Sequence, residues 1–439
     1  MRVESRMLFN AATHPAAAAH VDANIVAIVG LGYVGLPTAL AYAGRGRGVI
    51  GIDTSEPRLR RIRTGEVDLL DGDRSRLARA LSDPSFRLTA DPTLLRCAGT
   101  VIVCVPTPVD EHMVPDLEPL KRACATVVRN ASPGQTIVLT STSYVGTTRE
   151  LLIEPLANEG LDAGRDVFLA FSPERVDPGN GRFPQDAVPR VVGGATAECA
   201  ERAARMIGAI APHIHIVSSP EAAEMTKLYE NTFRAINIAF ANEMAGAASA
   251  LGVRIDEVID AAATKPYGFM RFTPGPGVGG HCIPCDPRYL QWQMQARRTP
   301  MPLLDRTMAS IAERPAAIVT RIRDVLSDRG TGLRDARVLV AGVAYKPGVE
   351  DVRESPAGEI IASLRSRGAI VEYHDPMVPV FTDALGVKMR SVAVLQPETY
   401  DLILAHTIHP GFDAALLRSA PVLLDATYRL PGWPNRVLP

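Results

Sequence analysis

Short apolar runs alternate with stretches of helical periodicity along the first half of the chain. The first run, residues 24–29 (NIVAIV), leads into a glycine-rich turn and a helical stretch over about 36–45. Three further runs, at 49–52, 100–105 and 136–140, have the length and composition of buried strands. Strands that are apolar on both faces and alternate with helices are typical of parallel sheets covered on both sides. The pattern therefore predicts an α/β domain with a doubly wound sheet.

The pattern changes near residue 220. Residues 220–251 contain little glycine or proline, and their apolar positions recur at helical spacing, which predicts one long helix or two that abut. A Gly/Pro-dense loop over 273–287 and a further helix over 303–326 follow. A second set of buried strands is predicted at 337–343, 369–373, 401–405 and 422–425. We therefore expect an α/β fold with two Rossmann-like doubly wound domains joined by a central helical region.

These changes divide the chain into four predicted segments. They are a flexible N-terminal extension (1–22), a first Rossmann domain (23–215), a central helical region (216–325) and a C-terminal α/β domain (326–439). No apolar run approaches the ~20 residues that span a bilayer, and the N-terminus lacks the apolar core of a signal peptide. We expect a cytoplasmic protein that does not contact a membrane.

Composition narrows the class of protein further. Hydrophobic residues make up 46% of the 439 residues and charged residues 22%, and the formal net charge of −1 provides no basic field for nucleic acid. Six cysteines in a long chain of this kind do not indicate a disulfide framework. Cys104, Cys124 and Cys199 lie in strand-like or helix-like stretches and are expected to be packing residues.

A dinucleotide site is predicted at the end of the first strand. Gly30, Gly32 and Gly35 form GxGxxG between a strand and a helix, which lets the backbone and the helix N-terminus approach a pyrophosphate. Asp53 ends the next strand about 20 residues later, where a carboxylate can bind ribose hydroxyls and disfavour a 2′-phosphate. A glycine turn without a ligand would not account for Asp53, so we expect NAD as cofactor.

The loop over 274–287 (PGPGVGGHCIPCDP) carries the most reactive chemistry. Ordering so many glycines is costly, which makes sense where a backbone must pass close to a substrate. Cys282 could act there as a nucleophile that forms a thioester. Two alternatives are a zinc or redox pair formed by Cys282 with Cys285, and a structural thiol. No second pair of zinc ligands follows in the chain, so we expect no metal. His281 is expected to be a packing or backbone-bonding residue and not the base.

Taken together, the motifs resemble those of the nucleotide-sugar dehydrogenases, which include the UDP-glucose and UDP-N-acetylhexosamine 6-dehydrogenases. The resemblance covers roughly residues 24–428 in the family's order. Its motifs are GLGYVGLP, CVPTPVD, STSYVGTT, SPERVDPGN, KLYENTFRAINIAFANE, PGPGVGGHCIPCDP and GVAYKPGVEDVRESP. The resemblance implies that the first domain binds NAD, the C-terminal domain binds the nucleotide sugar and the long central helix forms a homodimer or higher oligomer.

The resemblance also implies catalytic roles. Cys282 matches the nucleophile, Lys227 and Asn231 match an oxyanion-binding pair, and Asp286 matches a carboxylate near the cysteine that takes part in proton transfer. Glu174 and Thr142 match residues that position or activate the hydrolytic water. These roles agree with general chemistry, because a thiolate needs nearby positive charge, an oxyanion needs donors and hydrolysis needs a base.

Each role has a structural alternative. Lys227 could form a surface salt bridge with Glu224 or Glu230. Asn231 could be a polar helix residue that faces solvent. Glu174 could pair with Arg175 or another neighbour.

Further binding residues follow from the same resemblance. The expected cofactor contacts are Gly30, Gly32, Tyr33, Val34, Gly35, Asp53, Arg58, Thr107, Thr142 and Arg353. The expected substrate contacts are Glu174, Arg175, Lys227, Asn231, Gly279, Gly280 and Lys346. For Lys346 and Arg353 the alternative is pairing with Glu350 or Glu354. Gly268 replaces an arginine that many members carry, and the nearest arginine is Arg271.

The resulting prediction is a four-electron oxidation of a sugar C6 alcohol to a carboxylate, with polysaccharide biosynthesis as the expected setting. The substrate is expected to be UDP-glucose, dTDP-glucose or a UDP-N-acetylhexosamine. Two alternatives are a two-electron dehydrogenase of the 3-hydroxyacid type and an inactive NAD- or nucleotide-binding sensor. The first would not need Cys282 or a second α/β domain, and the second would be expected to lose Cys282, Lys227 or Asn231.

Overall fold

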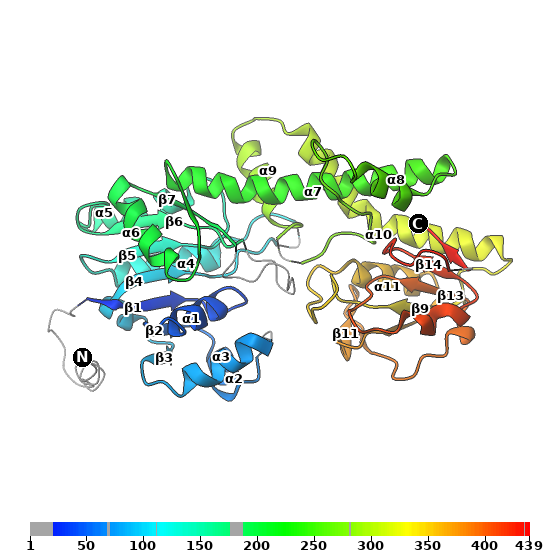
Figure 1. Ribbon diagram of the computed structural model, residues 1–439, viewed down its shortest axis with the longest axis horizontal. Coiled ribbons are helices and arrows are strands. Elements are labelled where there is room, and N and C mark those ends of the chain that lie inside the picture. The colour runs from blue at the N-terminus through cyan, green and yellow to red at the C-terminus, as the bar shows by residue number, and fades with distance from the viewer. Residues whose placement is uncertain (1–20, 68–70, 111, 176–187, 281, 434) are drawn as a thin grey trace. The chain divides into compact units, whose positions relative to one another are not determined.

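The computed structural model describes residues 21–67, 71–110, 112–175, 188–280, 282–433 and 435–439. The chain forms two compact units (Figure 1). Unit 1 comprises Met1–Thr107, Leu117–Arg175 and Pro184–Glu224, and unit 2 comprises Pro108–Asp116, Val176–Phe183 and Met225–Pro439. Most of the predicted N-terminal extension lies outside the described residues.

Unit 1 is built on an eight-stranded sheet with the order β3-β2-β1-β4-β5-β6-β7-β8. The strands are β1 (Asp22–Val29), β2 (Gly48–Ile52), β3 (Phe86–Thr89), β4 (Ala98–Val103), β5 (Thr136–Leu139), β6 (Phe168–Phe171), β7 (Arg190–Gly194) and β8 (Ile214–Val217). Every neighbouring pair is parallel except β6 and β7, which are antiparallel. The four strands predicted for this part of the chain are confirmed.

Both faces of this sheet are buried, as the continuous apolar runs predict. On β1, Val26 and Ile28 pack with Leu36 of helix α1 (Gly35–Ala43), whereas Ala27 on the other face packs with Leu120 of α4 (Glu118–Arg129). Because successive strand residues point to opposite faces, a strand covered on both sides must be apolar throughout. The remaining helices of unit 1 are α2 (Glu56–Thr64), α3 (Asp71–Leu81), α5 (Glu154–Asn158) and α6 (Ala197–Gly208).

Unit 2 contains a helical part and a second sheet. Its helices are α7 (Pro220–Ala250, whose first five residues belong to unit 1), α8 (Ile255–Ala262), α9 (Asp286–Ala296), α10 (Pro302–Asp328) and α11 (Pro356–Ser366). The sheet is parallel, with the order β10-β9-β13-β14-β15. Its strands are β9 (Arg337–Ala341), β10 (Ile370–His374), β13 (Leu402–Ala405), β14 (Leu423–Asp425) and β15 (Arg436–Val437). Strands β11 (Val380–Thr382) and β12 (Lys388–Arg390) form a separate antiparallel pair.

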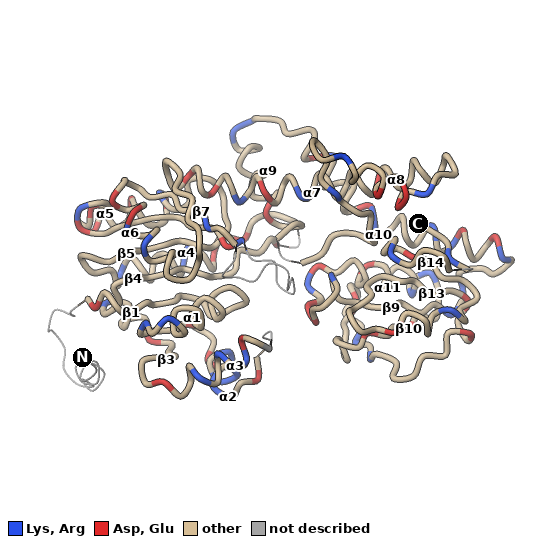
Figure 2. The backbone as a smooth tube through the Cα atoms, viewed as in Figure 1, with Lys and Arg blue, Asp and Glu red and all other residues tan. Residues whose placement is uncertain are grey.

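The predicted fold class is confirmed, because each unit contains a doubly wound α/β sheet and the helical region lies between the two sheets in the chain. The single helix α7 accounts for the long helical pattern near residue 220. Acidic and basic residues both occur throughout the two units (Figure 2). Among the described residues, no helix combines the length and the apolar character that crossing a bilayer requires.

Candidate active site

The predicted cofactor residues of unit 1 lie at one edge of its sheet. Gly30 follows β1, Asp53 follows β2, Thr107 lies shortly after β4, and Thr142 lies shortly after β5. These four strands are neighbours and parallel, so their carboxyl ends meet at the same edge. Strands β2 and β3 lie on one side of β1, and β4 and β5 lie on the other, so the order of strands along the chain reverses between β1 and β4. Open α/β sheets bind ligands at such a point.

The glycine turn leaves room for a ligand. A methyl group on Gly30, whose φ is +89°, would lie 2.6 Å from the Cys104 carbonyl oxygen, and one on Gly35 would lie 1.8 Å from the Gly30 carbonyl oxygen. A methyl group on Gly32, in contrast, would meet no atom of the described residues within 4 Å. The N-cap residue of α1 is Val34, which has no polar side chain, so no side chain caps this helix N-terminus in the place where a phosphate would bind. Gly30 and Gly35 therefore shape the turn, and Gly32 keeps its surface open.

Asp53 and Arg58 hold Leu31, which lies inside the turn. The Asp53 carboxylate accepts hydrogen bonds from the N–H groups of Leu31 and Ser55, each 2.9 Å long. Arg58 Nε donates to the Leu31 carbonyl oxygen at 3.0 Å. Each carboxylate oxygen can accept a second hydrogen bond, so Asp53 can orient the turn and still bind a ribose. These residues fit a dinucleotide, with Tyr33 exposed beside the turn.

Glu174 has a strong partner in unit 1. Its carboxylate lies 2.7 Å from Nη1 of Arg190, which is the first residue of β7 and is almost fully buried. The same carboxylate accepts a hydrogen bond from the Arg175 N–H, and Arg175 Nη1 donates to the Pro189 carbonyl oxygen. Glu174 thus forms an ion pair with a neighbour, as its structural alternative proposed, and that neighbour is Arg190. The role of Glu174 and Arg175 at a substrate stays a prediction.

In unit 2, the Cys282 loop and helix α7 assemble a polar cluster. Asp286 begins α9 and is buried, and its N–H donates to the Cys282 carbonyl oxygen at 2.8 Å. The side-chain amide of Asn231 on α7 donates a hydrogen bond to Asp286 Oδ2. Lys227 lies one helical turn before Asn231 and is also buried. The structure therefore brings Cys282, Asp286, Asn231 and Lys227 together.

The structural alternatives for the helix α7 residues are not what is observed. Asn231 is only 9% exposed, so it does not face solvent. Glu224 accepts hydrogen bonds from Thr148 and from the Gly146 N–H. Glu224, one of the two carboxylates named as partners for a surface pair with Lys227, is thus engaged within unit 1.

Within the cluster, burial and the neighbouring positive charges shift the pKa values of Asp286 and Cys282 in opposite directions. Burial raises the pKa of Asp286 to about 6, against the opposing effects of Lys227 and the Asn231 hydrogen bond. The Cys282 residue is exposed, but the protein packed around its sulfur raises the pKa of its thiol, and Asp286 adds to this effect. Lys227, Arg353 and Arg234 act in the opposite direction and stabilise the thiolate. The cluster thus contains a carboxyl group with a pKa of about 6 and a thiol whose pKa is raised by burial and Asp286 and lowered by three cations.

The loop between β9 and α11 packs directly on the glycines that precede Cys282. The Gly280 N–H donates to the Arg353 carbonyl oxygen at 2.9 Å. A methyl group on Gly279 would lie 2.7 Å from the Glu354 carbonyl oxygen, and one on Gly280 would lie 2.8 Å from the Tyr345 ring. These two glycines are needed for this close approach. Substrate contact by Gly279 and Gly280 stays a prediction.

Lys346 and Arg353 lie on this same loop. Lys346 Nζ lies 5.5 Å from the centre of the Tyr345 ring. Arg353 pairs with Asp351 through two nitrogens, at 2.6 and 3.0 Å, where the sequence alternatives named Glu350 and Glu354. The charge of Arg353 acts on the Cys282 thiol. The cofactor role expected for Arg353 stays a prediction.

Four of the five remaining cysteines are buried, and Cys97 is partly exposed. Cys104, Cys124 and Cys199 are buried, as predicted, and Cys285 is buried as the N-cap residue of α9. Within the described ranges, no group of three or more His, Cys, Asp and Glu side chains is arranged to hold a metal ion. His281 lies outside the described residues. Arg271, the arginine nearest Gly268, pairs with Asp260.

Sequence reasoning missed two arginines of these sites. Arg234 lies two helical turns after Lys227, so the spacing of Lys227, Asn231 and Arg234 on one helix face could have identified it. Arg190 could not be found in this way, because its partner Glu174 belongs to a different strand region and the pair forms only when β7 joins the sheet.

Comparison with known proteins was made for the whole chain. Three sequence profiles match in order: the NAD binding domain of the UDP-glucose/GDP-mannose dehydrogenase family at residues 24–211, its central domain at 221–311 and its UDP binding domain at 339–430. The chain belongs to the UDP-glucose/GDP-mannose dehydrogenase family. The resemblance seen in the motifs is confirmed. As a member of this family the chain uses NAD, and unit 1 contains the turn that fits it.

Several members of the UDP-glucose/GDP-mannose dehydrogenase family are similar over most of their length. The UDP-N-acetyl-D-glucosamine 6-dehydrogenase of Pseudomonas aeruginosa is 33% identical, over 88% of this chain and 91% of that protein. An NDP-N-acetyl-D-galactosaminuronic acid dehydrogenase of Ralstonia nicotianae is 31% identical, over 92% and 96%. The solved UDP-D-ManNAc dehydrogenase of Pyrococcus horikoshii superimposes with a TM-score of 0.85 at 30% identity, covering 94% of this chain and 98% of that one.

Proposed function

We propose that this chain is an NAD-dependent 6-dehydrogenase of a UDP-N-acetylhexosamine, and that it oxidises the C6 alcohol to a carboxylate through a thioester on Cys282. The observation that carries the proposal is the cluster of Cys282, Asp286, Asn231 and Lys227 in unit 2. A two-electron alcohol dehydrogenase would need neither an exposed cysteine with three nearby cations nor the donors beside it.

The proposed chemistry assigns a step to each side chain. Oxidation of the alcohol yields an aldehyde, and the Cys282 sulfur adds to its carbonyl carbon to form a thiohemiacetal. Loss of a second hydride converts the thiohemiacetal to a thioester, and water then releases the carboxylate and regenerates the thiol. When bound, NAD accepts one hydride in each of the two oxidations, so the reaction consumes one water and two NAD and forms two NADH. Lys227 and the Asn231 amide stabilise the oxyanion of the tetrahedral species.

Asp286 is the carboxylate best suited to take the proton from the hydrolytic water. Its pKa of about 6 lies near the working pH, where a general base is most effective. The Glu174 carboxylate is instead engaged in an ion pair with the Arg190 guanidinium, at 2.7 Å. We therefore assign Glu174 and Thr142 to positioning water or substrate.

The substrate class rests on the named relatives. The similar proteins described above are named for UDP-N-acetylglucosamine, N-acetylgalactosaminuronic acid and UDP-D-ManNAc. The C-terminal sheet of unit 2 matches the UDP binding domain of the family, and Lys346 lies on a loop at the carboxyl end of its strand β9. A loop at this position is where parallel α/β sheets bind ligands. The names of these relatives favour an N-acetylated sugar over UDP-glucose.

Counting NADH per sugar consumed tests the proposal. We would supply UDP-N-acetylglucosamine, UDP-N-acetylgalactosamine, UDP-N-acetylmannosamine, UDP-glucose and dTDP-glucose in turn. We expect two NADH per sugar, with turnover fastest for one of the N-acetylated sugars. Cys282→Ser should reduce turnover by at least about 10³-fold, the effect of losing a nucleophile. Cys285→Ser is the matched control and should still form two NADH. A yield of one NADH per sugar would contradict the thioester mechanism.

We further propose that the chain forms a homodimer through α7. Tyr229, Phe233, Phe240 and Met244 recur along this helix at spacings of four and seven residues, and each is at least 40% exposed. Such a stripe of large apolar side chains on one helix face is characteristic of a protein interface. A second copy of the same helix would cover the stripe with a self-complementary surface.

A further inference from the structure

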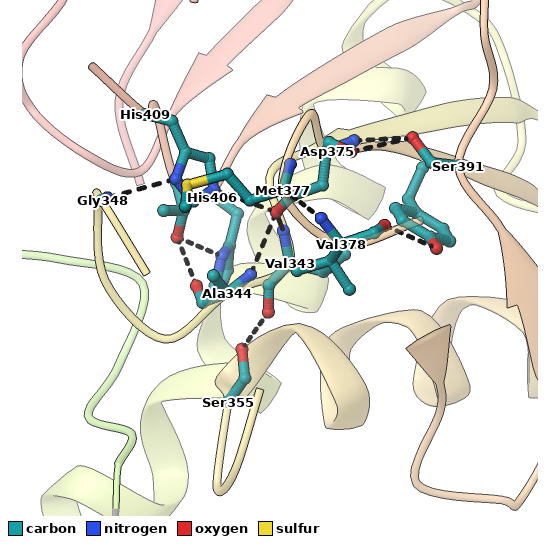
Figure 3. Close-up of polar contacts among 12 residues, drawn as sticks. Val343, Ala344, Gly348, Ser355, Asp375, Met377, Val378, Ser391, His406 and His409 are labelled. Atoms are coloured by element: carbon teal, nitrogen blue, oxygen red, sulfur yellow. Dashed lines mark hydrogen bonds and ion pairs between the residues drawn. The ribbon is translucent and has the colours of Figure 1, made fainter. Parts of the chain in front are cut away.

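A buried carboxylate at the end of β10 binds the loop that carries Lys346. Asp375 follows β10 and is 2% exposed. Its Oδ2 accepts hydrogen bonds from the N–H groups of Val343 and Ala344, at 2.8 and 3.2 Å (Figure 3). Its Oδ1 accepts two more from Met377 and Val378. The side chain thus ties the first residues of the β9–α11 loop, residues 342–355, to the neighbouring strand.

His409 extends this connection to the centre of the loop. It is 3% exposed, its Nε2 lies 3.1 Å from Asp375 Oδ2, and its Nδ1 lies 3.2 Å from the Gly348 backbone nitrogen (Figure 3). The Gly348 N–H can only donate, so Nδ1 must be the unprotonated acceptor. The ring proton therefore resides on Nε2 and is donated to Asp375. This arrangement selects one tautomer of a neutral imidazole.

Other contacts hold the same loop at its two ends. The Thr407 hydroxyl donates to the Ala344 carbonyl oxygen at 2.7 Å, and the Ser355 hydroxyl donates to the Val343 carbonyl oxygen at 2.7 Å. His406 lies beside them, and burial lowers its pKa to about 4, so it remains neutral. The contact from His409 is the one that reaches Gly348, two residues after Lys346.

The loop held in this way supports both parts of the unit 2 site. It carries Lys346, and its residues 345, 353 and 354 form the surface against which Gly279 and Gly280 pack. Cys282 follows Gly280 by two residues. A shift of the loop would therefore move Lys346 and the backbone before Cys282 together, because the close packing of glycines on Tyr345 leaves no free space.

We propose, on the basis of the function proposed above, that Asp375 and His409 are positioning residues that set the affinity for the nucleotide sugar by fixing the Lys346 loop through the Gly348 N–H. Neither residue needs to touch the substrate. A buried polar pair whose partners are backbone groups of one loop restricts that loop to one conformation.

Two substitutions of His409 separate its two hydrogen bonds. In His409→Asn the side-chain oxygen occupies the position of Nδ1 and can still accept from Gly348. In His409→Gln the side-chain amide occupies the position of Nε2 and can still donate to Asp375, but the acceptor for Gly348 is lost. His215→Gln is the matched control, because His215 is an exposed residue of β8 in unit 1.

The measurements are steady-state kinetics, calorimetric binding of UDP and hydrogen–deuterium exchange of peptides covering residues 342–355. For His409→Gln we expect the KM for the nucleotide sugar and the Kd for UDP to rise about tenfold, as for loss of one hydrogen bond, with faster exchange in the loop. The KM for NAD and the kcat should change less than about threefold. His409→Asn should remain within about threefold of the wild type in every measurement.

Equal behaviour of the Asn and Gln variants, or unchanged loop exchange and UDP affinity in His409→Gln, would overturn the proposal. The exchange and UDP measurements do not depend on turnover. If the wild-type protein oxidised none of the nucleotide sugars, the function proposed above would fail, whereas these two measurements would still decide the role of His409.

Discussion

The side-chain amide of Asn231 donates a hydrogen bond to the carboxylate of Asp286, which lies 55 residues later in the chain. This contact joins helix α7 to the first residue of α9 and places a polar donor beside the Cys282 loop. Asp286 nevertheless remains a carboxyl group with a pKa of about 6, because burial outweighs the effects of Asn231 and Lys227. The site therefore contains a carboxylate that is costly to ionise in the folded protein.

The first prediction concerns stability. The folded-state pKa of Asp286 lies above its ordinary value of 3.8, so its stabilising contribution is complete below pH 3.8 and is lost as pH rises through about 6. At pH 7.5 ionisation costs on the order of 2–3 kcal/mol. Asp286→Asn removes this charge and should raise the melting temperature at pH 7.5, with a smaller gain at pH 5, while abolishing turnover.

Asp375→Asn serves as the contrast. Burial alone would raise the pKa of Asp375, but hydrogen bonds from His409 and the Val343 N–H outweigh burial and lower it. Its contribution is therefore present above its ordinary pKa and is lost as pH falls through the lowered value. Asp375→Asn should lower the melting temperature at pH 7.5. A melting temperature for Asp286→Asn at or below that of the wild type would refute the first prediction.

The second prediction concerns the reactivity of the Cys282 thiol. Asp286 raises the pKa of this thiol and Lys227 lowers it. Lys227→Met should therefore slow alkylation by iodoacetamide at pH 8, and Asp286→Asn should accelerate it, because the thiolate is the reactive form. Mass spectrometry of the peptide that contains Cys282 provides the rates, with Cys282→Ser as the unlabelled control. Changes of the same sign in both variants would exclude the proposed electrostatic arrangement.

The third prediction separates two glycines of the cofactor turn. A methyl group on Gly32 meets no described atom within 4 Å, so Gly32→Ala should keep the wild-type melting temperature but weaken NAD binding at least about tenfold by blocking the pyrophosphate. A methyl group on Gly35 would lie 1.8 Å from the Gly30 carbonyl oxygen, so Gly35→Ala should lower stability by about 1–3 kcal/mol. Calorimetry and thermal unfolding measure the two effects. Unchanged NAD affinity in Gly32→Ala would count against a ligand at this turn.

The fourth prediction concerns assembly. Tyr229 and Phe240 are 66% and 59% exposed on α7. The double variant Tyr229→Glu and Phe240→Glu should convert a dimer to a monomer, because it would place buried charges in an apolar interface. Light scattering after size-exclusion chromatography measures the mass. Leu385→Glu, at an equally exposed position between β11 and β12, is the control and should remain a dimer. A monomeric wild-type protein would contradict the proposed interface.

The sequence determined the features that depend on residues close to one another in the chain. Runs such as 24–29 are apolar at every position, and a strand can tolerate this only when both faces are covered, so the doubly wound sheet was predictable. The glycine turn followed by Asp53 and the glycine-dense loop around Cys282 are local in the same sense. Lys227 and Asn231 lie on the same helix face because residues four apart in a helix are neighbours on its surface.

Only the tertiary structure decided which distant groups meet and how deeply they are buried. Asn231 reaches Asp286, Glu174 meets Arg190, and His409 links Asp375 to Gly348. None of these pairs can be predicted from the spacing of residues in the sequence, since each joins segments that approach one another only in the folded protein. The pKa of Asp286 is likewise a property of the assembled site, because the free energy of ionising a carboxyl group depends on the water that folding removes from around it.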